Sequence, residues 1–202
     1  MANVLARDEC MRLVAARLRP TDLVVSGLGS TARSWKAAGG PQLTYYASDP
    51  MGMGPTIALG LALARPQQRV ILLEGDGNLL MSLGALATIA GAAPPNLKVI
   101  LFANGCYETT GMQPTAAADR LQFALIAEGA GFPSAREAAE TAGAERTIAA
   151  LLAEEGLGFL ALKVATAWTP YAPAPPLSIA EEKVLFQQAL AARDRAAATP
   201  DA

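Results

Sequence analysis

A carboxylate and a side-chain amide follow two apolar segments of this sequence, and together they could bind a hard metal ion. Residues 70–74 lead into Gly75-Asp76-Gly77-Asn78, and residues 99–103 lead into Asn104. Both runs are rich in aliphatic and β-branched residues, as buried parallel strands are. Open α/β sheets bind ligands at the carboxyl ends of such strands. Because Asp76 and Asn104 offer oxygen ligands there, the sequence predicts a Mg²⁺ site shared with a phosphate group.

This pair of motifs resembles the cofactor signature of the thiamine-diphosphate (ThDP) enzymes, which is Gly-Asp-Gly followed at a distance by Asn. Here 26 residues lie between Gly77 and Asn104, a spacing that the family shares. The resemblance implies that Asp76, the Asn104 side chain and the backbone carbonyl of Cys106 bind Mg²⁺. Ala103 stands where the family commonly has a second Asn.

The same resemblance implies a diphosphate site built from two turns. Gly75, Gly77 and Asn78 lie where a helix is expected to begin, and helix N-termini favour anions. The second turn holds Gly29 and Ser30, after the strand predicted at 22–26; capping of the next short helix is the alternative role. A Rossmann site is disfavoured, since no G-x-G-x-x-G follows a predicted strand with an acidic residue about 20 positions later.

A third segment, residues 48–54 (SDPMGMG), precedes the helix predicted at 55–64. ThDP enzymes carry a similar turn, with a bulky apolar residue at the position of Met51. The resemblance implies that Met51 wedges between the two cofactor rings and that the Asp49 carbonyl accepts a hydrogen bond from the pyrimidine amine. A gap-filling core methionine is the alternative for Met51 and is the role predicted for Met53.

The loop after Asn104 holds the candidate acid–base residue. Glu108 is the only acidic residue in that loop and is the predicted catalytic group if it points into the site; a structural or solvated carboxylate is the alternative. Other ThDP decarboxylases place an active-site glutamate two residues later, at Thr110 here. Tyr107 is expected to contact the cofactor or a partner. A nucleophilic role for the Cys106 thiol is disfavoured, because the chain has no histidine to activate it.

Alternating strands and helices are expected to position these residues. Strands are predicted at 22–26, 43–47, 70–74, 99–103 and 159–164, and helices at 3–18, 55–64, 79–91, 118–129, 135–140, 145–155 and 178–197. Ser178 and Glu181 form a predicted capping box, and the proline-rich residues 170–176 are expected to be extended. The pattern predicts a doubly wound α/β domain over residues 1–202, with a mostly parallel sheet and helices on both faces.

Composition limits the classes of partner. Apolar residues make up 52% of the chain and charged residues 17%, with a net charge of −2, so neither nucleic acid nor a membrane surface is an expected partner. Two cysteines are too few for a disulfide framework, and residues 1–19 read as an amphipathic helix rather than a signal peptide. A cytoplasmic location is therefore predicted.

One domain accounts for only half of a ThDP catalytic unit. In that family a second domain of similar size binds the pyrimidine ring and supplies a glutamate to its ring nitrogen. Because 202 residues leave no room for it, we expect a separate pyrimidine-binding subunit, with the site at the interface. An α2β2 or larger hetero-oligomer is the expected assembly.

Residues 102–115 (FANGCYETTGMQPT) are similar to the sulfopyruvate and phosphonopyruvate decarboxylases, the former of which also occurs as two subunits. The resemblance implies ThDP- and Mg²⁺-dependent, non-oxidative decarboxylation of a 2-oxo acid. Residues 168–177 lack the arginine that these enzymes tend to carry there. Trp168 and Tyr171 could therefore line a pocket for a less polar substrate, or simply pack between the last helix and the sheet.

Three other functions stay open from the sequence. The first is a carboligase of the acetolactate synthase type, and the second is the ThDP subunit of a 2-oxo-acid oxidoreductase. The oxidoreductase would need iron–sulfur clusters on a partner, because two cysteines cannot hold one. The third is a non-catalytic regulatory subunit that keeps the fold.

Overall fold

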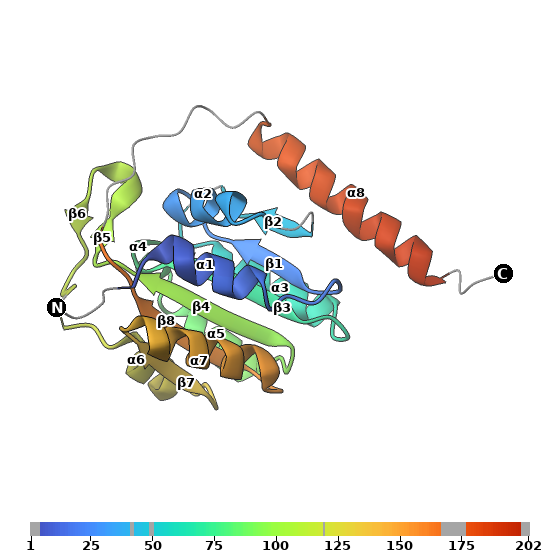
Figure 1. The fold of residues 1–202 in the computed structure, drawn as a ribbon. Helices are drawn as coiled ribbons and strands as arrows, with labels where there is room; N and C mark the ends of the chain where they lie inside the picture. The colour runs from blue at the N-terminus through green and yellow to red at the C-terminus, as the bar shows by residue number, and fades with distance from the viewer. Residues whose placement is uncertain (1–4, 41–42, 49–50, 119, 167–176, 199–202) are drawn as a thin grey trace.

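A computed structural model describes residues 5–40, 43–48, 51–118, 120–166 and 177–198. Six parallel strands form one sheet in the order β2–β1–β3–β4–β8–β7, with helices on both faces (Figure 1). This confirms the doubly wound α/β fold. The six strands are β1 (Leu23–Ser26), β2 (Thr44–Tyr46), β3 (Val70–Gly75), β4 (Leu97–Ala103), β7 (Ala135–Ala138) and β8 (Gly158–Lys163).

The helices form two layers, because successive strand residues face opposite sides of the sheet. On one side Val70 and Leu72 join a core with α3, α5 and α6, and on the other Ile71 and Leu73 join a core with α1, α2 and α7. These helices are α1 (Arg7–Ala15), α2 (Ser30–Ala37), α3 (Gly54–Ala64), α5 (Ala85–Ala92), α6 (Phe123–Ala130) and α7 (Thr141–Ala153). Both faces are apolar, so the sheet is buried as parallel sheets are.

Strand order reverses beside β1. The chain passes from β1 outward to β2 and then returns to place β3 on the other side of β1. Connections that leave β1 and β3 in opposite directions open a crevice at their carboxyl ends, where ligands bind in folds of this kind. The Asp76 motif follows β3 directly, as helix α4 (Asp76–Leu80).

Some predicted elements differ from the structure. The helix predicted at 135–140 is wrong: these residues hold β7, an edge strand that pairs in parallel with β8. Four residues, of which only Ala138 is buried, are too few for a periodicity to separate strand from helix. The helices predicted at 118–129 and 145–155 begin instead at Phe123 and Thr141. A small antiparallel pair, β5 (Cys106–Tyr107) and β6 (Gln113–Pro114), joined by a 3₁₀ turn (Glu108–Thr110), was not predicted.

The helix predicted at 79–91 is divided into α4 and α5. The chain turns between them, and the Ser82 hydroxyl donates to the backbone carbonyl of Gly52 at 2.6 Å. Gly84, a poor helix former, immediately precedes α5. The break therefore ties the segment after Asp76 to the turn that carries Met51.

Helix α8 (Ile179–Ala198) lies along the β2 edge of the sheet (Figure 1). Phe186 packs edge-on against Tyr45, with 5.5 Å between ring centroids. The predicted capping box is confirmed: Ser178 N–H donates to Glu181 Oε2 at 2.7 Å, and Glu181 N–H to Ser178 Oγ at 3.3 Å. The extended segment predicted at 170–176 lies outside the described residues, as do Trp168 and Tyr171. Among the described helices, none combines the length and apolarity needed to cross a bilayer.

Candidate cofactor site

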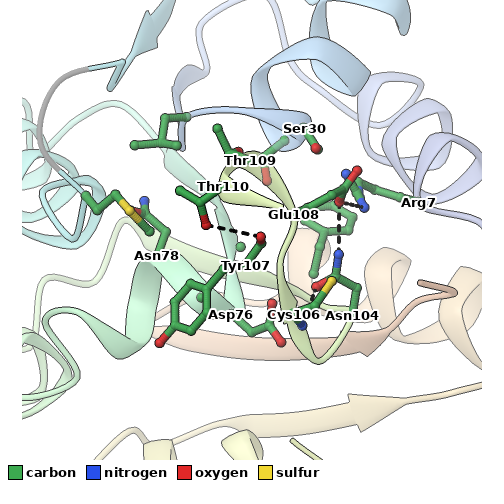
Figure 2. A pocket seen from close by; sticks show the side chains of 16 residues that line it. Arg7, Ser30, Asp76, Asn78, Asn104, Cys106, Tyr107, Glu108, Thr109 and Thr110 are labelled. Carbon is green, nitrogen blue, oxygen red and sulfur yellow. Dashed lines mark hydrogen bonds and ion pairs between the residues drawn. The ribbon is translucent and has the colours of Figure 1, made fainter. Parts of the chain in front are cut away.

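A cavity opens at the carboxyl ends of β1, β3 and β4, and most of the predicted site residues line it (Figure 2). Gly29 lies between two lining residues, Leu28 and Ser30, and Asp49 lies outside the described residues. The predicted residues that line the cavity are Ser30, Met51, Gly75, Asp76, Gly77, Asn78, Asn104, Cys106, Tyr107 and Glu108. Four separate loops thus converge on one site, as expected for a sheet edge at which the strand order reverses.

Asp76 links the two halves of the proposed metal motif. Its carboxylate Oδ2 accepts the Gly105 N–H at 2.8 Å, so the turn after β3 and the loop after β4 are joined. The side chain is buried, and burial raises the pKa of Asp76 above its ordinary value, while hydrogen bonds from backbone N–H groups act against this rise. An ionised carboxylate in such surroundings is stabilised by a cation.

The Cys106 carbonyl oxygen faces the same turn. A Cβ atom added at Gly77 would lie 3.5 Å from that oxygen and only 2.7 Å from Tyr107 Cδ1. Glycine therefore permits the close approach of the two loops. Carboxylate, amide and carbonyl oxygens suit Mg²⁺. Among the described residues, no group of three or more His, Cys, Asp or Glu side chains is placed to hold a metal ion. Burial also raises the pKa of the Cys106 thiol, which agrees with a role for its carbonyl rather than its sulfur.

Hydrogen bonds from both its side chain and its backbone hold Asn104. Its Nδ2 donates to Glu108 Oε2 at 2.9 Å, and its Oδ1 accepts the Cys106 N–H at 3.1 Å. Its backbone carbonyl accepts from Thr166 Oγ1 at 2.6 Å. The amide side chain is therefore held in a single orientation within the loop.

Glu108 lies beside this amide and is paired with Arg7 from α1 (Figure 2). Arg7 Nη2 lies 2.5 Å from Glu108 Oε2, and the two side chains are only 10% and 7% exposed. The second carboxylate oxygen, Oε1, is buried without a hydrogen-bond partner. Sequence reasoning missed Arg7, because it lies 101 positions before Glu108 and nothing local connects them.

The turn that carries Met51 is tied to the Asp76 segment. Gly52 N–H donates to Asn78 Oδ1 at 2.7 Å, and Asn78 Nδ2 donates to Glu74 Oε1 at 2.6 Å. Glu74 is fully buried, and burial raises its pKa from 4.5 to about 7 against the lowering effect of hydrogen bonds from Asn78 and Gly75. Met51 is thereby held at the cavity. The core role predicted for Met53 is wrong, since its side chain is 44% exposed.

The loop before α2 completes the cavity wall. Gly29 has φ +67°, and a Cβ atom there would lie 2.1 Å from Thr109 Oγ1, so only glycine fits. The Ser30 hydroxyl accepts a hydrogen bond from Arg33 at 2.7 Å and makes no capping bond to the helix backbone. Ser30 therefore does not cap α2, which was the alternative role. Lining residues to which sequence reasoning gave no role are Arg7, Leu28, Thr31, Phe102, Thr109 and Thr110.

Comparison with known proteins agrees with this geometry. Residues 27–162 match the family described as the thiamine pyrophosphate enzyme, C-terminal TPP binding domain, and the chain belongs to that family. The matched segment contains every predicted cofactor residue, from Gly29 to Tyr107. The family prediction is confirmed, and with it thiamine diphosphate as the cofactor for which this kind of domain is built.

Two relatives are decarboxylases. The chain is 39% identical over 129 residues to sulfopyruvate decarboxylase subunit beta of Methanothermobacter thermautotrophicus, covering 64% of this chain and 68% of that subunit. It is 38% identical over 109 residues to phosphonopyruvate decarboxylase of Streptomyces hygroscopicus, covering 54% of this chain but only 27% of that protein. Within the ThDP enzymes, the chain therefore groups with the decarboxylases.

A solved structure shows the same fold. Benzoylformate decarboxylase from Polynucleobacter necessarius superposes with a TM-score of 0.72 over 83% of this chain and 34% of that chain. Only 15% of the residues are identical, so this likeness concerns the fold alone.

Proposed function

We propose that this chain binds ThDP through Mg²⁺ and acts as one subunit of a non-oxidative 2-oxo-acid decarboxylase. The observation that carries the proposal is the hydrogen bond from Gly105 N–H to Asp76, which joins the two halves of the metal motif at the strand-order reversal. The family match and the subunit beta relative support it. The cofactor, when bound, supplies the electron sink that decarboxylation requires.

The residues of this chain would bind and orient that cofactor. Asp76, Asn104 Oδ1 and the Cys106 carbonyl would hold Mg²⁺, which would carry the diphosphate. The backbone of Gly75, Gly77 and Asn78, with Gly29 and Ser30 across the cavity, would surround the diphosphate. Met51 and Tyr107 would contact the rings, and the carbonyl of Asp49, outside the described residues, keeps its predicted contact with the pyrimidine amine.

A separate pyrimidine-binding subunit is the proposed partner. The relative from Methanothermobacter thermautotrophicus is named as a beta subunit, whereas sulfopyruvate decarboxylase of Methanosarcina acetivorans, 31% identical over 184 residues, is matched over only 47% of its length. That difference is what a two-subunit and a one-chain form of the same enzyme would give. A hetero-oligomer of α2β2 type or larger and a cytoplasmic location stay predictions of the same proposal.

The proposed substrate is a small 2-oxo acid of the class that these relatives decarboxylate. Sulfopyruvate and phosphonopyruvate are the first candidates, and a 2-oxo acid without a second acidic group is the alternative raised by residues 168–177. Acetolactate synthase isozyme 1 of Escherichia coli also matches, at 36% identity over 72 residues, which keeps a carboligase as the second candidate.

The test is calorimetric titration of ThDP with Mg²⁺ into this chain, alone and together with the subunit that co-purifies with it. The Asp76→Asn variant serves as the control, because it keeps an acceptor for Gly105 N–H and removes the metal-binding charge. We expect Mg²⁺-dependent binding that strengthens with the partner and disappears in the variant. Binding that is absent in every preparation of the folded chain would refute the proposal.

A substrate panel then separates the reactions. Carbon dioxide release from sulfopyruvate, phosphonopyruvate, pyruvate and benzoylformate is measured with the complete complex. Release of one carbon dioxide and one aldehyde per substrate identifies a decarboxylase. A condensed product formed from two 2-oxo acids would identify the carboligase instead.

A further inference from the structure

Asn104 can serve a metal ion only with its oxygen, and an amide side chain presents nitrogen just as readily when it rotates by half a turn. Something in the site has to fix the orientation. Glu108 Oε2 lies 2.9 Å from Asn104 Nδ2, and an ionised carboxylate can only accept hydrogen bonds. The contact therefore requires the amide nitrogen on the Glu108 side and leaves Oδ1 on the opposite side.

The Oδ1 contact agrees with this orientation. Cys106 N–H, a donor, lies 3.1 Å from Oδ1, so a rotated amide would place two donors together. Rotation would break both contacts at once, one with a carboxylate and one with a backbone donor. A hydrogen bond to a charged group is among the stronger kinds, so the carboxylate is the main lock.

Arg7 holds the carboxylate in turn. Its Nη2 lies 2.5 Å from the oxygen that Asn104 uses, and both side chains are at least nine-tenths buried. The ion pair therefore fixes the position of the oxygen that Asn104 uses. Arg7 itself is anchored by the chain around it, because Leu5 forms a parallel bridge with Val164 and Ala165 N–H donates to the Leu5 carbonyl at 2.8 Å.

We propose that Glu108 and Arg7 are positioning residues for the metal site: the ion pair orients the Asn104 amide so that its oxygen faces the metal. Glu108 then acts through Asn104 and not by proton transfer. A structural carboxylate was the alternative that the sequence left open. The inference rests on the proposed function, since it concerns the ligand that Asn104 would offer to Mg²⁺. It also assigns the N-terminal helix a role in cofactor binding.

Mg²⁺ affinity tests the proposal. Mg²⁺ is titrated by calorimetry at a fixed, high ThDP concentration into the chain with its co-purifying subunit. Partners that orient a metal ligand typically contribute 10–100-fold to metal affinity, and we expect a loss of about that size for Glu108→Leu. Glu108→Gln keeps an oxygen that can accept from Asn104 Nδ2, so we expect a smaller loss, of less than about tenfold. Arg7→Met is expected to fall between the two.

Controls separate this effect from a general loss of structure. Arg17→Met breaks an ion pair with Glu145 near the same helix, where the two side chains are 28% and 58% exposed, and is expected to bind Mg²⁺ as the wild type does. The double variant Arg7→Met/Glu108→Gln removes both buried charges together and serves if Glu108→Leu does not fold. Its Mg²⁺ affinity is also expected to fall below that of the wild type. Circular dichroism checks the fold of each variant without cofactor.

Each outcome decides between roles. A folded Glu108→Leu variant that binds Mg²⁺ within twofold of the wild type would overturn the proposal. So would a Glu108→Gln variant whose turnover collapses while its Mg²⁺ affinity is unchanged, because that result identifies proton transfer. A wild type that binds neither Mg²⁺ nor ThDP would instead refute the proposed function, and this inference with it.

Discussion

Buried charged side chains lie at both ends of the same strands, but they are satisfied differently. At the amino ends, Arg69 Nε donates to Asp22 Oδ1 at 3.0 Å and its other nitrogens reach Asp22 Oδ2 and the backbone carbonyls of Leu152 and Arg17. Lys98 donates to the Gly156 carbonyl at 2.5 Å. Within the described part of the chain, none of these charged side chains retains a buried polar atom without a partner.

At the carboxyl ends the hydrogen bonding is incomplete. Glu74 and Glu108 each keep one buried carboxylate oxygen without a partner, and Asp76 is a buried acid with a raised pKa. A fully paired set of buried charges stabilises the fold, whereas a missing partner costs stability. Asp76 and Glu108 line the cavity, where a ligand could supply the missing contact, but Glu74 does not. The charged side chains at the amino edge are therefore fully paired, whereas those at the carboxyl edge, where the cavity opens, are not.

The largest expected effect is at the carboxyl edge. Asp76→Asn is expected to weaken Mg²⁺-dependent ThDP binding by more than about 1,000-fold, or about 4 kcal/mol, because the one charged metal ligand is lost. The metal-free variant is expected to unfold at the same temperature as the wild type or higher, since a buried charge is removed. Calorimetry and thermal denaturation measure the two quantities. A variant that is less stable than the wild type and still binds ThDP would show that Asp76 stabilises the fold and does not bind the metal.

The second effect is at the amino edge, where we expect a loss of stability and no change in cofactor affinity. Asp22→Ala leaves Arg69 buried without its counter-charge and is expected to lower the free energy of unfolding by about 3–5 kcal/mol. Cofactor affinity of the remaining folded protein is expected to be unchanged. Urea denaturation gives the stability, and Asp22→Asn, which keeps an acceptor, should lose less. A weaker affinity for ThDP in either folded variant would contradict the separation of the two edges.

The third prediction concerns pH. Because the pKa of Glu74 is raised from 4.5 to about 7 in the folded chain, its stabilising contribution is complete below pH 4.5 and is lost as the pH rises through about 7. Between about pH 5 and pH 8, the metal-free wild type should lose about 2 kcal/mol of stability that Glu74→Gln does not lose. Urea denaturation across this pH range measures the difference. Parallel pH profiles of the two proteins would show that the pKa of Glu74 is not raised in the folded chain.

The smallest effect is expected away from both edges. Arg17→Met breaks the exposed pair with Glu145 and should change the free energy of unfolding by less than about 1 kcal/mol. Added salt should reduce even that difference, because exposed ion pairs are screened. Denaturation at low and high ionic strength is the measurement. A loss comparable to that of Asp22→Ala would mean that burial does not distinguish these pairs.

The local patterns of the sequence were sufficient for the motif that matters most. Residues 70–74 and 99–103 read as strands because their apolar runs are continuous, and the residues directly after them had to lie at one edge of a parallel sheet. Asp76 and Asn104 followed from that alone. The Ser178 and Glu181 capping box was equally predictable, since both hydrogen bonds lie within one turn of a helix.

Tertiary structure decided the contacts between segments that no local pattern connects. Only the fold brings Arg7 to Glu108 and the Gly52 N–H to Asn78, and only packing against β8 makes residues 135–138 a strand rather than a helix. Short segments take their conformation from their neighbours, because a few residues contribute too little intrinsic preference to resist packing. The sequence by itself therefore predicted which atoms would bind the metal and cofactor, and the tertiary structure determined how those atoms are held.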